Sequence, residues 1–282
     1  MKLCDLHTHS RFSDGTCSVE EILHKAEEMG LSAVALTDHN NVDGLESFLE
    51  KAKGLTVEAV PGIEVSTEYN DKELHVVALL VDRQHFSTAK EFFAIPKARK
   101  EESNIQLAKS LNENGYALDY EKIKNSVDGF PNRVHFAKEL LKKGYVTSIE
   151  HAFDTILSQD YGFYKPPKRL TTFETIEFIK SINAVSVLAH PLLDLTESEL
   201  FEFLEKAKPY GLDGMEVRYS SFTPKQSEWL EKLATKYGLL MSGGSDFHGE
   251  NKPDISLGSG RGELEVPYEF LTKMKEKLGK NV

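Results

Sequence analysis

The sequence predicts an α/β fold, in which a parallel sheet or barrel is interrupted by one all-helical segment. Three observations support this prediction. Short apolar runs occur early and late in the chain, helix-start signals lie between them, and the stretch 94–166 carries helical patterns only. Strands that alternate with helices along a chain are typical of parallel sheets and barrels.

Several apolar runs have the length of buried strands. The early runs are Lys2–Leu6, Ala33–Thr37, Val57–Val60 with Gly62–Val65, and Leu74–Leu80. The late runs are Ala184–Ala189, Gly214–Val217 and Leu239–Ser242. We expect each of them to contribute to the sheet or barrel.

Helix starts between these runs are marked by capping boxes, in which a Ser or Thr stands three residues before a Glu. The boxes are Ser18 with Glu21, Thr147 with Glu150, Thr171 with Glu174, and Thr196 with Glu199. Thr223 followed by Pro224 is a further start signal, because proline is favoured at the first helical position.

The stretch 94–166 is expected to hold three helices, Pro96–Gly115, Asn132–Gly144 and Thr147–Gln159. We therefore predict a barrel domain in two parts, residues 1–93 and 167–282, with residues 94–166 as a helical insertion domain. The insertion has a net charge of +1, whereas the rest of the chain has −12. A helical insertion that is less acidic than its host indicates a lid over an anionic substrate. A plain structural insertion is the alternative.

Composition narrows the functional classes. The chain has 282 residues and a formal net charge of −11, which disfavours binding of long double-stranded nucleic acid. Its two cysteines form no metal-binding pair and no disulfide framework. We see no run as long as a membrane span and no signal peptide, so we expect a soluble cytoplasmic protein without a membrane partner. We expect a monomer, because no segment has the pattern of a coiled coil.

Histidines and carboxylates gather near the ends of the predicted strands. They are His7, His9, His39, Glu64, His75, His190, Asp246 and His248. In α/β barrels the carboxyl ends of the strands form the active face, where groups from distant parts of the chain converge. Buried imidazoles and carboxylates are costly unless they are paired, and a shared cation pairs all of them. The set therefore predicts a metal site.

Imidazole and carboxylate ligands together suit zinc, manganese or iron rather than calcium. The set is too large for one coordination sphere, which indicates two ions or more. Two neighbouring ions can clamp a phosphoryl group and activate a water, so the predicted chemistry is phosphoester hydrolysis. The sequence has no G-x-S-x-G nucleophile elbow and no G-x-x-x-x-G-K-[ST] phosphate loop.

These residues resemble the motifs of the polymerase and histidinol phosphatase (PHP) family of metallohydrolases, and the resemblance spans almost the whole chain. The matching segments are Asp5–Ser10, Ser13–Gly15, Leu36–His39, Gly62–Ser66, Leu188–Pro191 and Gly244–His248. The resemblance implies a distorted (β/α)7 barrel, here with the helical insertion.

The resemblance also implies how two to three divalent ions (Mn, Fe or Zn) share their ligands. One ion would take the side chains of His7, His9, Glu64 and Asp246. A second would take Glu64 as a bridge together with His75 and His190, and a third would take Asp14, His39 and His248.

The insertion resembles a subgroup that removes phosphate from nucleoside 3′,5′-bisphosphates or trims short RNA from its 5′ end. The match covers Asn132–Leu140, and the resemblance implies that Arg133 and His135 lie near the substrate phosphates. Lys165 is similar to the lysine of a Gly-Lys-Pro turn in the subgroup, with Tyr164 in place of the glycine. Arg99 lies where the subgroup carries arginines. Surface charge, or helix packing for His135, is the alternative for these four residues.

We therefore expect a metal-dependent phosphoesterase acting on a small phosphorylated substrate, foremost a nucleoside 3′,5′-bisphosphate. Glu64 would bridge two ions beside the attacking water. The sequence does not assign the proton donor, and His190 and His248 are candidates only if they are not fully committed to metal. Asp38 is expected to orient the imidazole of His39, with an ordinary turn residue as the alternative. Three alternatives stay open: a 5′-3′ exonuclease on short oligonucleotides, a histidinol-phosphate-type phosphatase, and a catalytically silent metal-binding module.

Overall fold

A computed structural model describes residues 2–126 and 131–280. These residues form two compact units by their contacts. The first unit comprises Met1–Lys90 and Leu170–Val282, and the second is the insertion Glu91–Arg169.

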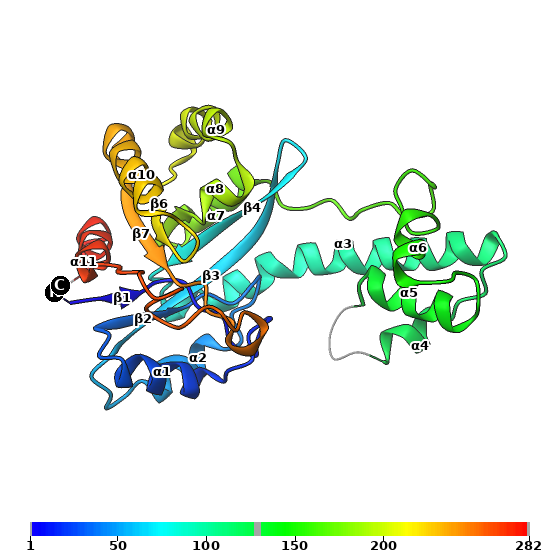
Figure 1. The fold of residues 1–282 in the computed structure, drawn as a ribbon, viewed down its shortest axis with the longest axis horizontal. Helices are drawn as coiled ribbons and strands as arrows, with labels where there is room; N and C mark the ends of the chain where they lie inside the picture. Colours follow the sequence, from blue (N-terminus) through cyan, green and yellow to red (C-terminus); the bar gives the residue numbers. More distant parts are fainter. Residues whose placement is uncertain (1, 127–130, 281–282) are drawn as a thin grey trace. The chain divides into compact units, whose positions relative to one another are not determined.

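The first unit is built on one sheet whose strands follow each other in sequence order (Figure 1). They are β1 (Cys4–Asp5), β2 (Ala33–Leu36), β3 (Glu58–Tyr69), β4 (Lys72–Leu79), β5 (Val185–Leu188), β6 (Gly214–Tyr219) and β7 (Leu240–Gly244). The backbone N–H of Leu6, just after β1, donates to the carbonyl of Gly243 in β7 at 3.2 Å. The sheet is thereby nearly closed into a barrel of seven strands, which confirms the predicted fold class.

One strand runs against the others. The runs expected at Val57–Val60 and Gly62–Val65 form the single strand β3, which turns directly into β4 through Asn70 and Asp71. Both turn residues have positive φ (50° and 63°), as a two-residue hairpin turn requires. No helix fits into so short a connection, so β4 pairs antiparallel with β3 and β5 while the other neighbours pair parallel. The beginning of β4 consequently lies at the same barrel end as the carboxyl ends of the other strands.

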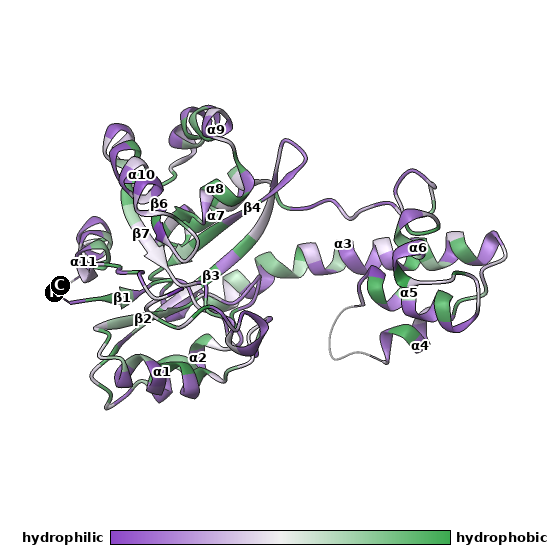
Figure 2. Ribbon diagram, in the orientation of Figure 1, coloured by the Kyte–Doolittle hydropathy of each residue, from purple (hydrophilic) through white to green (hydrophobic). Residues whose placement is uncertain are grey.

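Helices follow most strands and pack against the sheet. They are α1 (Val19–Glu28), α2 (Leu45–Lys51), α7 (Thr172–Ser181), α8 (Pro191–Asp194), α9 (Glu197–Tyr210), α10 (Pro224–Tyr237) and α11 (Tyr268–Lys277), with the 3₁₀ turns η1 (Arg83–His85) and η2 (Gly249–Asn251). Ser18, Thr171, Thr196 and Thr223 are the N-caps of their helices, as predicted. These helices carry both hydrophobic and hydrophilic segments (Figure 2), and buried side chains such as Ile22 and Phe203 face inward.

Helix α3 (Phe86–Glu113) begins in the first unit and continues into the insertion, which also contains α4 (Tyr120–Lys124), α5 (Arg133–Lys142) and α6 (Ile149–Asp154). Three expectations were wrong. The first helix begins at Phe86 and continues through Pro96, which costs it one backbone hydrogen bond. Ser148, not Thr147, caps α6, because its hydroxyl accepts the N–H of His151. The short helix α4 was not expected. Of the helices that the structure describes, none is both long and apolar enough to cross a membrane.

Candidate metal centre

The predicted ligands meet at one end of the barrel. His7 and His9 follow β1, His39 follows β2, His190 follows β5, and Asp246 and His248 follow β7. Glu64 lies within β3 and His75 within β4, and Asp14 comes from the loop between β1 and α1. Three groups have ligand atoms within 4.8 Å of one another: His9, Asp14, His39 and His248; His7, His9, Glu64 and Asp246; and His39, Glu64 and His75.

Glu64 is the centre of this cluster, with a side chain only 1% exposed. Its Oε1 lies 2.8 Å from His75 Nδ1 and 3.0 Å from His190 Nε2. Its Oε2 lies 3.1 Å from the Nε2 atoms of His7 and His9 and 3.2 Å from His39 Nδ1. Each oxygen therefore faces a different set of imidazoles, which is the arrangement of a carboxylate that bridges two ions.

The inner group consists of His7, His9, Glu64 and Asp246, all of them buried. Asp246 Oδ1 lies 3.2 Å from His9 Nε2 and 3.7 Å from His7 Nε2. Two imidazoles and two carboxylates make a four-ligand set of the kind that zinc, manganese or iron takes in proteins.

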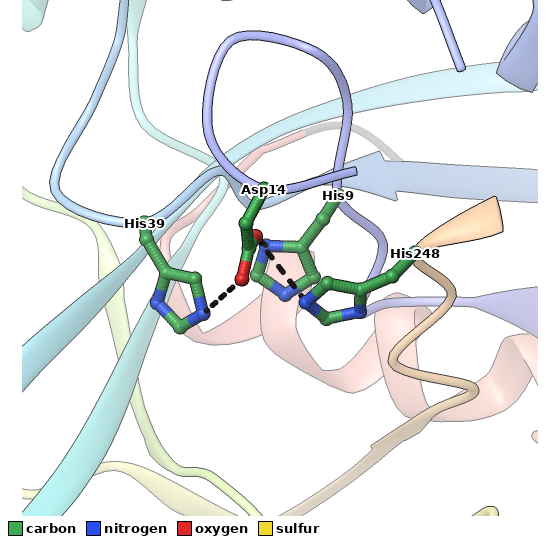
Figure 3. A group of neighbouring side chains, drawn as sticks. All are labelled: His9, Asp14, His39 and His248. Carbon is green, nitrogen blue, oxygen red and sulfur yellow. Dashed lines mark ion pairs between the residues drawn. The ribbon is translucent and has the colours of Figure 1, made fainter. Parts of the chain in front are cut away.

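The outer group is open to solvent through Asp14, whose side chain is 53% exposed. Figure 3 shows Asp14 between the imidazoles of His39 and His248, with dashed lines for its ion pairs to both. Asp14 Oδ1 lies 3.2 Å from His248 Nε2, and its Oδ2 lies 3.7 Å from His39 Nε2. His9 belongs to both groups, since its Nδ1 lies 3.6 Å from Asp14 Oδ1 while its Nε2 faces Glu64. An ion in the outer group would be the one that solvent and substrate reach.

Unsatisfied atoms show that these residues fit a bound cation. Among the described residues, six buried atoms of the cluster have no hydrogen-bond partner: His7 Nε2, both ring nitrogens of His9, His39 Nδ1, Glu64 Oε2 and His190 Nδ1. Leaving one buried polar atom unpaired costs about 1–3 kcal/mol. So many in one place require an explanation, and divalent ions between them would supply one.

Several imidazoles of the cluster are shifted toward the charged form, whereas burial lowers the pKa of His39 to about 4. Burial opposes ionisation of Glu64, but the charges of His7, His39 and His75 outweigh it and hold the carboxyl pKa well below its usual range. Burial also opposes the charged form of His75, yet Glu64 raises its pKa to about 10. Asp194 and Glu64 raise the pKa of His190 to about 9 against the same penalty. The imidazole nitrogens that carry protons here are the atoms that would bind metal ions, so metal binding would release these protons.

The backbone around the ligands has rarely adopted φ angles and one unusually close approach. His190 and Asp246 have positive φ angles of 25° and 57°, which non-glycine residues rarely adopt. Gly244 lies so close to the first strand that a Cβ there would stand 2.3 Å from His7 Cβ. Strained residues of this kind cost on the order of 1–3 kcal/mol each and cluster at functional sites.

Glu216 was missed by the sequence reasoning and lies directly behind the ligands. Its Oε1 lies 2.9 Å from His7 Nδ1, and its Oε2 accepts the backbone N–H of His190 at 2.6 Å. The signal was present, because Glu216 interrupts an apolar run at a strand end. Arg218, two residues further along β6, does not join the ligands, because a bulge between the two residues turns it toward Glu231 of α10.

Asp38 does not orient His39, contrary to expectation. Its Oδ1 accepts from the backbone N–H of Ser10 at 2.8 Å and from the Ser13 hydroxyl at 2.6 Å, and its Oδ2 accepts from the Ser10 hydroxyl at 2.7 Å. Neighbouring residues of an extended segment point to opposite sides, so Asp38 faces away from its neighbour's imidazole. Asp38 instead secures the loop that carries Asp14.

Of the expected substrate residues of the insertion, Arg133 and Arg99 make contacts within that unit. The guanidinium of Arg133 lies 4.4 Å from the ring centroid of Tyr164 and 5.3 Å from that of Phe153. Arg99 donates to the carbonyl of Lys168 at 3.3 Å, and the side chain of Lys165 is exposed.

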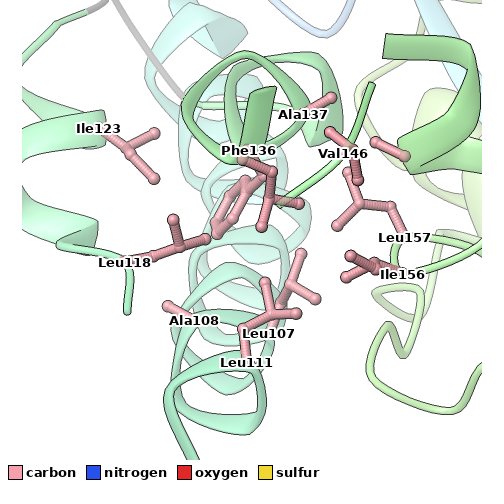
Figure 4. Close-up of a cluster of buried hydrophobic side chains, with 12 residues drawn as sticks. Leu107, Ala108, Leu111, Leu118, Ile123, Phe136, Ala137, Val146, Ile156 and Leu157 are labelled. Atoms are coloured by element: carbon pink, nitrogen blue, oxygen red, sulfur yellow. The ribbon is translucent and has the colours of Figure 1, made fainter. Parts of the chain in front are cut away.

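His135 has a structural role at the start of α5. Its Nδ1 accepts the backbone N–H of Asn132 at 3.0 Å, which closes the helix N-terminus. The same helix packs through Phe136 and Ala137 on the buried hydrophobic cluster of the insertion (Figure 4). The starting point of α5, and with it Arg133, is therefore fixed by a cap and by a packed core.

Comparisons with known proteins agree with this geometry. A family model described as the PHP domain matches residues 5–163. The chain is 30% identical over 248 residues to a protein of Haemophilus influenzae named 5'-3' exoribonuclease, covering 88% of this chain and 90% of that one. It is 27% identical over 256 residues to the 3',5'-nucleoside bisphosphate phosphatase of Chromobacterium violaceum, covering 89% and 90%.

A solved structure shares the fold over the whole chain. It is a Bifidobacterium adolescentis protein assigned as a metal-dependent phosphoesterase, with a TM-score of 0.70 and 25% identity, covering 98% of this chain and 96% of that one.

Proposed function

Because the chain belongs to the PHP domain family and is a metal-dependent phosphoesterase, we propose that it removes a phosphate from a nucleoside 3′,5′-bisphosphate. The observation that carries the hydrolytic part is the convergence of buried, unsatisfied imidazole and carboxylate atoms on Glu64. The substrate is supported by the similarity to the Chromobacterium violaceum phosphatase of that name.

Divalent ions (manganese, iron or zinc) held by the cluster would supply Lewis acidity and a water of lowered pKa. The residues of the chain have distinct parts in this. Glu64 would hold ions on both sides, since each of its oxygens faces its own imidazoles. Asp14 and His248 line the solvent-facing side, where a phosphoryl group would enter. His190, whose Nδ1 lies 3.5 Å from Asp194, and His248 stay the proposed proton donors to the leaving oxygen.

Substrate recognition is proposed for residues of the insertion. A bisphosphate has a second phosphate beside the one that is cleaved, and cationic side chains bind such a group through charge-assisted hydrogen bonds. Arg133, Lys165 and Arg99 are proposed to provide them. A substrate contact is less well supported for His135, because one of its ring nitrogens already caps α5. The predicted monomeric state and cytoplasmic location stay predictions.

A 5′-3′ exonuclease acting on short oligonucleotides is the second candidate. It is supported by the relative in Haemophilus influenzae, which matches this chain at slightly higher identity than the phosphatase does. Both activities need the same metal chemistry, so the cluster does not discriminate between them. They differ in the phosphoryl group that water attacks: a terminal phosphomonoester, released as inorganic phosphate, in the bisphosphate, and a phosphodiester that stays attached to the shortened chain in the oligonucleotide.

The test is hydrolysis by the manganese-loaded protein of four substrates: adenosine 3′,5′-bisphosphate, a 5′-phosphorylated trinucleotide, histidinol phosphate and an aryl phosphate. We expect the highest kcat/KM on the bisphosphate and loss of all activity in chelator. A higher kcat/KM on the trinucleotide, with mononucleotide products, would replace the proposal by the exonuclease. Preference for histidinol phosphate, or no hydrolysis by fully metal-loaded protein, would refute both nucleotide readings.

The substrate residues need their own control. Arg133→Ala should raise KM for the bisphosphate about tenfold or more, because a phosphate loses a charged partner. Arg261→Ala removes an arginine that pairs with Asp254 in the first unit and should leave KM unchanged. Equal effects of both substitutions would contradict the assignment of Arg133.

A further inference from the structure

The carboxylate oxygen of Asp246 that faces away from the other ligands of the inner group accepts two hydrogen bonds. Its Oδ1 faces the imidazoles of the cluster, at 3.2 Å from His9 Nε2 and 3.4 Å from His248 Nδ1. Its Oδ2 accepts the hydroxyl of Tyr219 at 2.7 Å and the ammonium of Lys252 at 2.6 Å. The two oxygens of one carboxylate thus have separate partners.

Both donors are held in place by the fold. Tyr219 is the last residue of β6 and is 6% exposed, with its ring 5.3 Å from that of His190 and 5.2 Å from that of Phe222. Because a carboxylate oxygen can only accept, the Tyr219 hydroxyl is the donor of this contact. Lys252 follows η2 directly and its backbone N–H donates to the Gly249 carbonyl, while its side chain is 36% exposed.

An ionised carboxylate oxygen has about two lone-pair positions. Tyr219 and Lys252 use both positions of Oδ2, so only Oδ1 is left to bind an ion. Hydrogen bonds to charged groups are among the strongest in proteins, which keeps this orientation fixed. A carboxylate without such partners can rotate or bind through both oxygens, and the geometry around the ion then changes.

We propose that Tyr219 and Lys252 are positioning residues that make Asp246 a one-oxygen ligand and so set the affinity and geometry of the inner metal ion. The proposal rests on the proposed metal centre. Outer partners of this kind orient the ligands of metal sites, and their loss typically weakens metal binding about 10–100-fold. Neither residue stands in any of the metal-ligand motifs of the sequence.

The chain contains a matched control for both side chains. Glu58 Oε2, at the start of β3, accepts the hydroxyl of Tyr268 at 2.7 Å and the ammonium of Lys275 at 2.7 Å. Glu58 precedes Glu64 by six positions on the strand, which is about 20 Å at 3.3 Å per residue. The same chemical contact can therefore be removed far from the cluster.

The experiment compares Tyr219→Phe and Lys252→Met with Tyr268→Phe and Lys275→Met in the full chain. The dissociation constant for Mn²⁺ is measured by chelator competition, and the Mn²⁺ electron paramagnetic resonance spectrum reports the ligand geometry. We expect the first two variants to bind about 10–100-fold more weakly and to change the spectrum, and the controls to match the wild type. Lys252→Arg, which keeps a cationic donor, should recover most of the affinity.

Wild-type affinity and spectra in Tyr219→Phe and Lys252→Met would overturn the inference and leave the metal centre standing. Equal weakening in the control variants would also overturn it, because the cause would then be general destabilisation. A wild-type protein that binds no Mn²⁺ would overturn the metal centre itself. If Lys252→Met fails to fold, the comparison of Tyr219→Phe with Tyr268→Phe still decides, since a positioning role requires weaker binding and an altered spectrum in the first variant only.

Discussion

Glu216→Gln replaces one carboxylate oxygen by an NH₂ group and should disturb two ligands of the metal centre. Glu216 contacts His7 Nδ1 through one oxygen and the backbone N–H of His190 through the other, and its side chain is 1% exposed. For His7 to bind an ion through Nε2, its proton must sit on Nδ1 and donate to Glu216. A carboxylate accepts at both ends, whereas an amide accepts at one end and donates at the other.

Each orientation of the glutamine creates a conflict. If its oxygen faces His7, its NH₂ group faces the N–H of His190 and two donors meet. If it is flipped, its NH₂ group donates to His7 Nδ1, so the proton moves to Nε2 and that atom can no longer bind metal. We expect the affinity for Mn²⁺ to fall about 10–100-fold, which corresponds to about 1.4–2.7 kcal/mol.

Calorimetric titration of the metal-free protein with Mn²⁺ measures this effect. Glu231→Gln is the matched control, because Glu231 pairs with Arg218 on the outer side of the same strand. It should bind Mn²⁺ as the wild type does. Wild-type affinity in Glu216→Gln would refute the reasoning that Glu216 fixes the tautomer of His7.

Three other changes should have distinct effects. Asp38→Asn should release the loop with Ser10 and Ser13, so that metal analysis finds the outer ion lost and the inner ion retained; loss of both would contradict this. Phe136→Ala, at a fully buried position, should destabilise the insertion by about 3–5 kcal/mol. Limited proteolysis should then cut within 91–169 while Mn²⁺ affinity persists, and uncut protein would count against this packing. Raising the pH from 7 to 9 should tighten Mn²⁺ binding, because His75 and His190, with pKa values of about 10 and about 9, must lose protons to the ion. Titrations in buffers of different ionisation enthalpy should show proton release at pH 7, and no release would contradict the assignment.

The clustering of the strand-end residues could be predicted from the sequence, because the strand ends of a barrel meet at one face even when they are far apart along the chain. His7, His9 and His39 follow apolar runs, and in a barrel such positions meet at one face. His75 stands at the opening of its run, and the hairpin through Asn70 and Asp71 reverses that strand and brings its beginning to the same face. The position of His75 in its run was therefore not sufficient by itself, because its placement depends on this hairpin.

The residues that hold the ligands in place were less predictable, because their positions depend on local backbone features such as bulges and turns. Regular alternation would put Glu216 and Arg218 on one face of β6, and the bulge that separates them leaves no mark in the sequence. The role expected of Asp38 ignored the alternation of neighbouring side chains. The role of Lys252 depends on the turn after His248, which no periodic pattern encodes.

The most direct test of the central claim follows phosphate release from adenosine 3′,5′-bisphosphate while metal-free protein is titrated with Mn²⁺, in the wild type and in Glu64→Gln. We expect no release without metal, a rise as the groups around Glu64 fill, and a variant that has lost most of its activity. Release in the presence of chelator, or wild-type rates in Glu64→Gln, would contradict the claim that this cluster performs the hydrolysis.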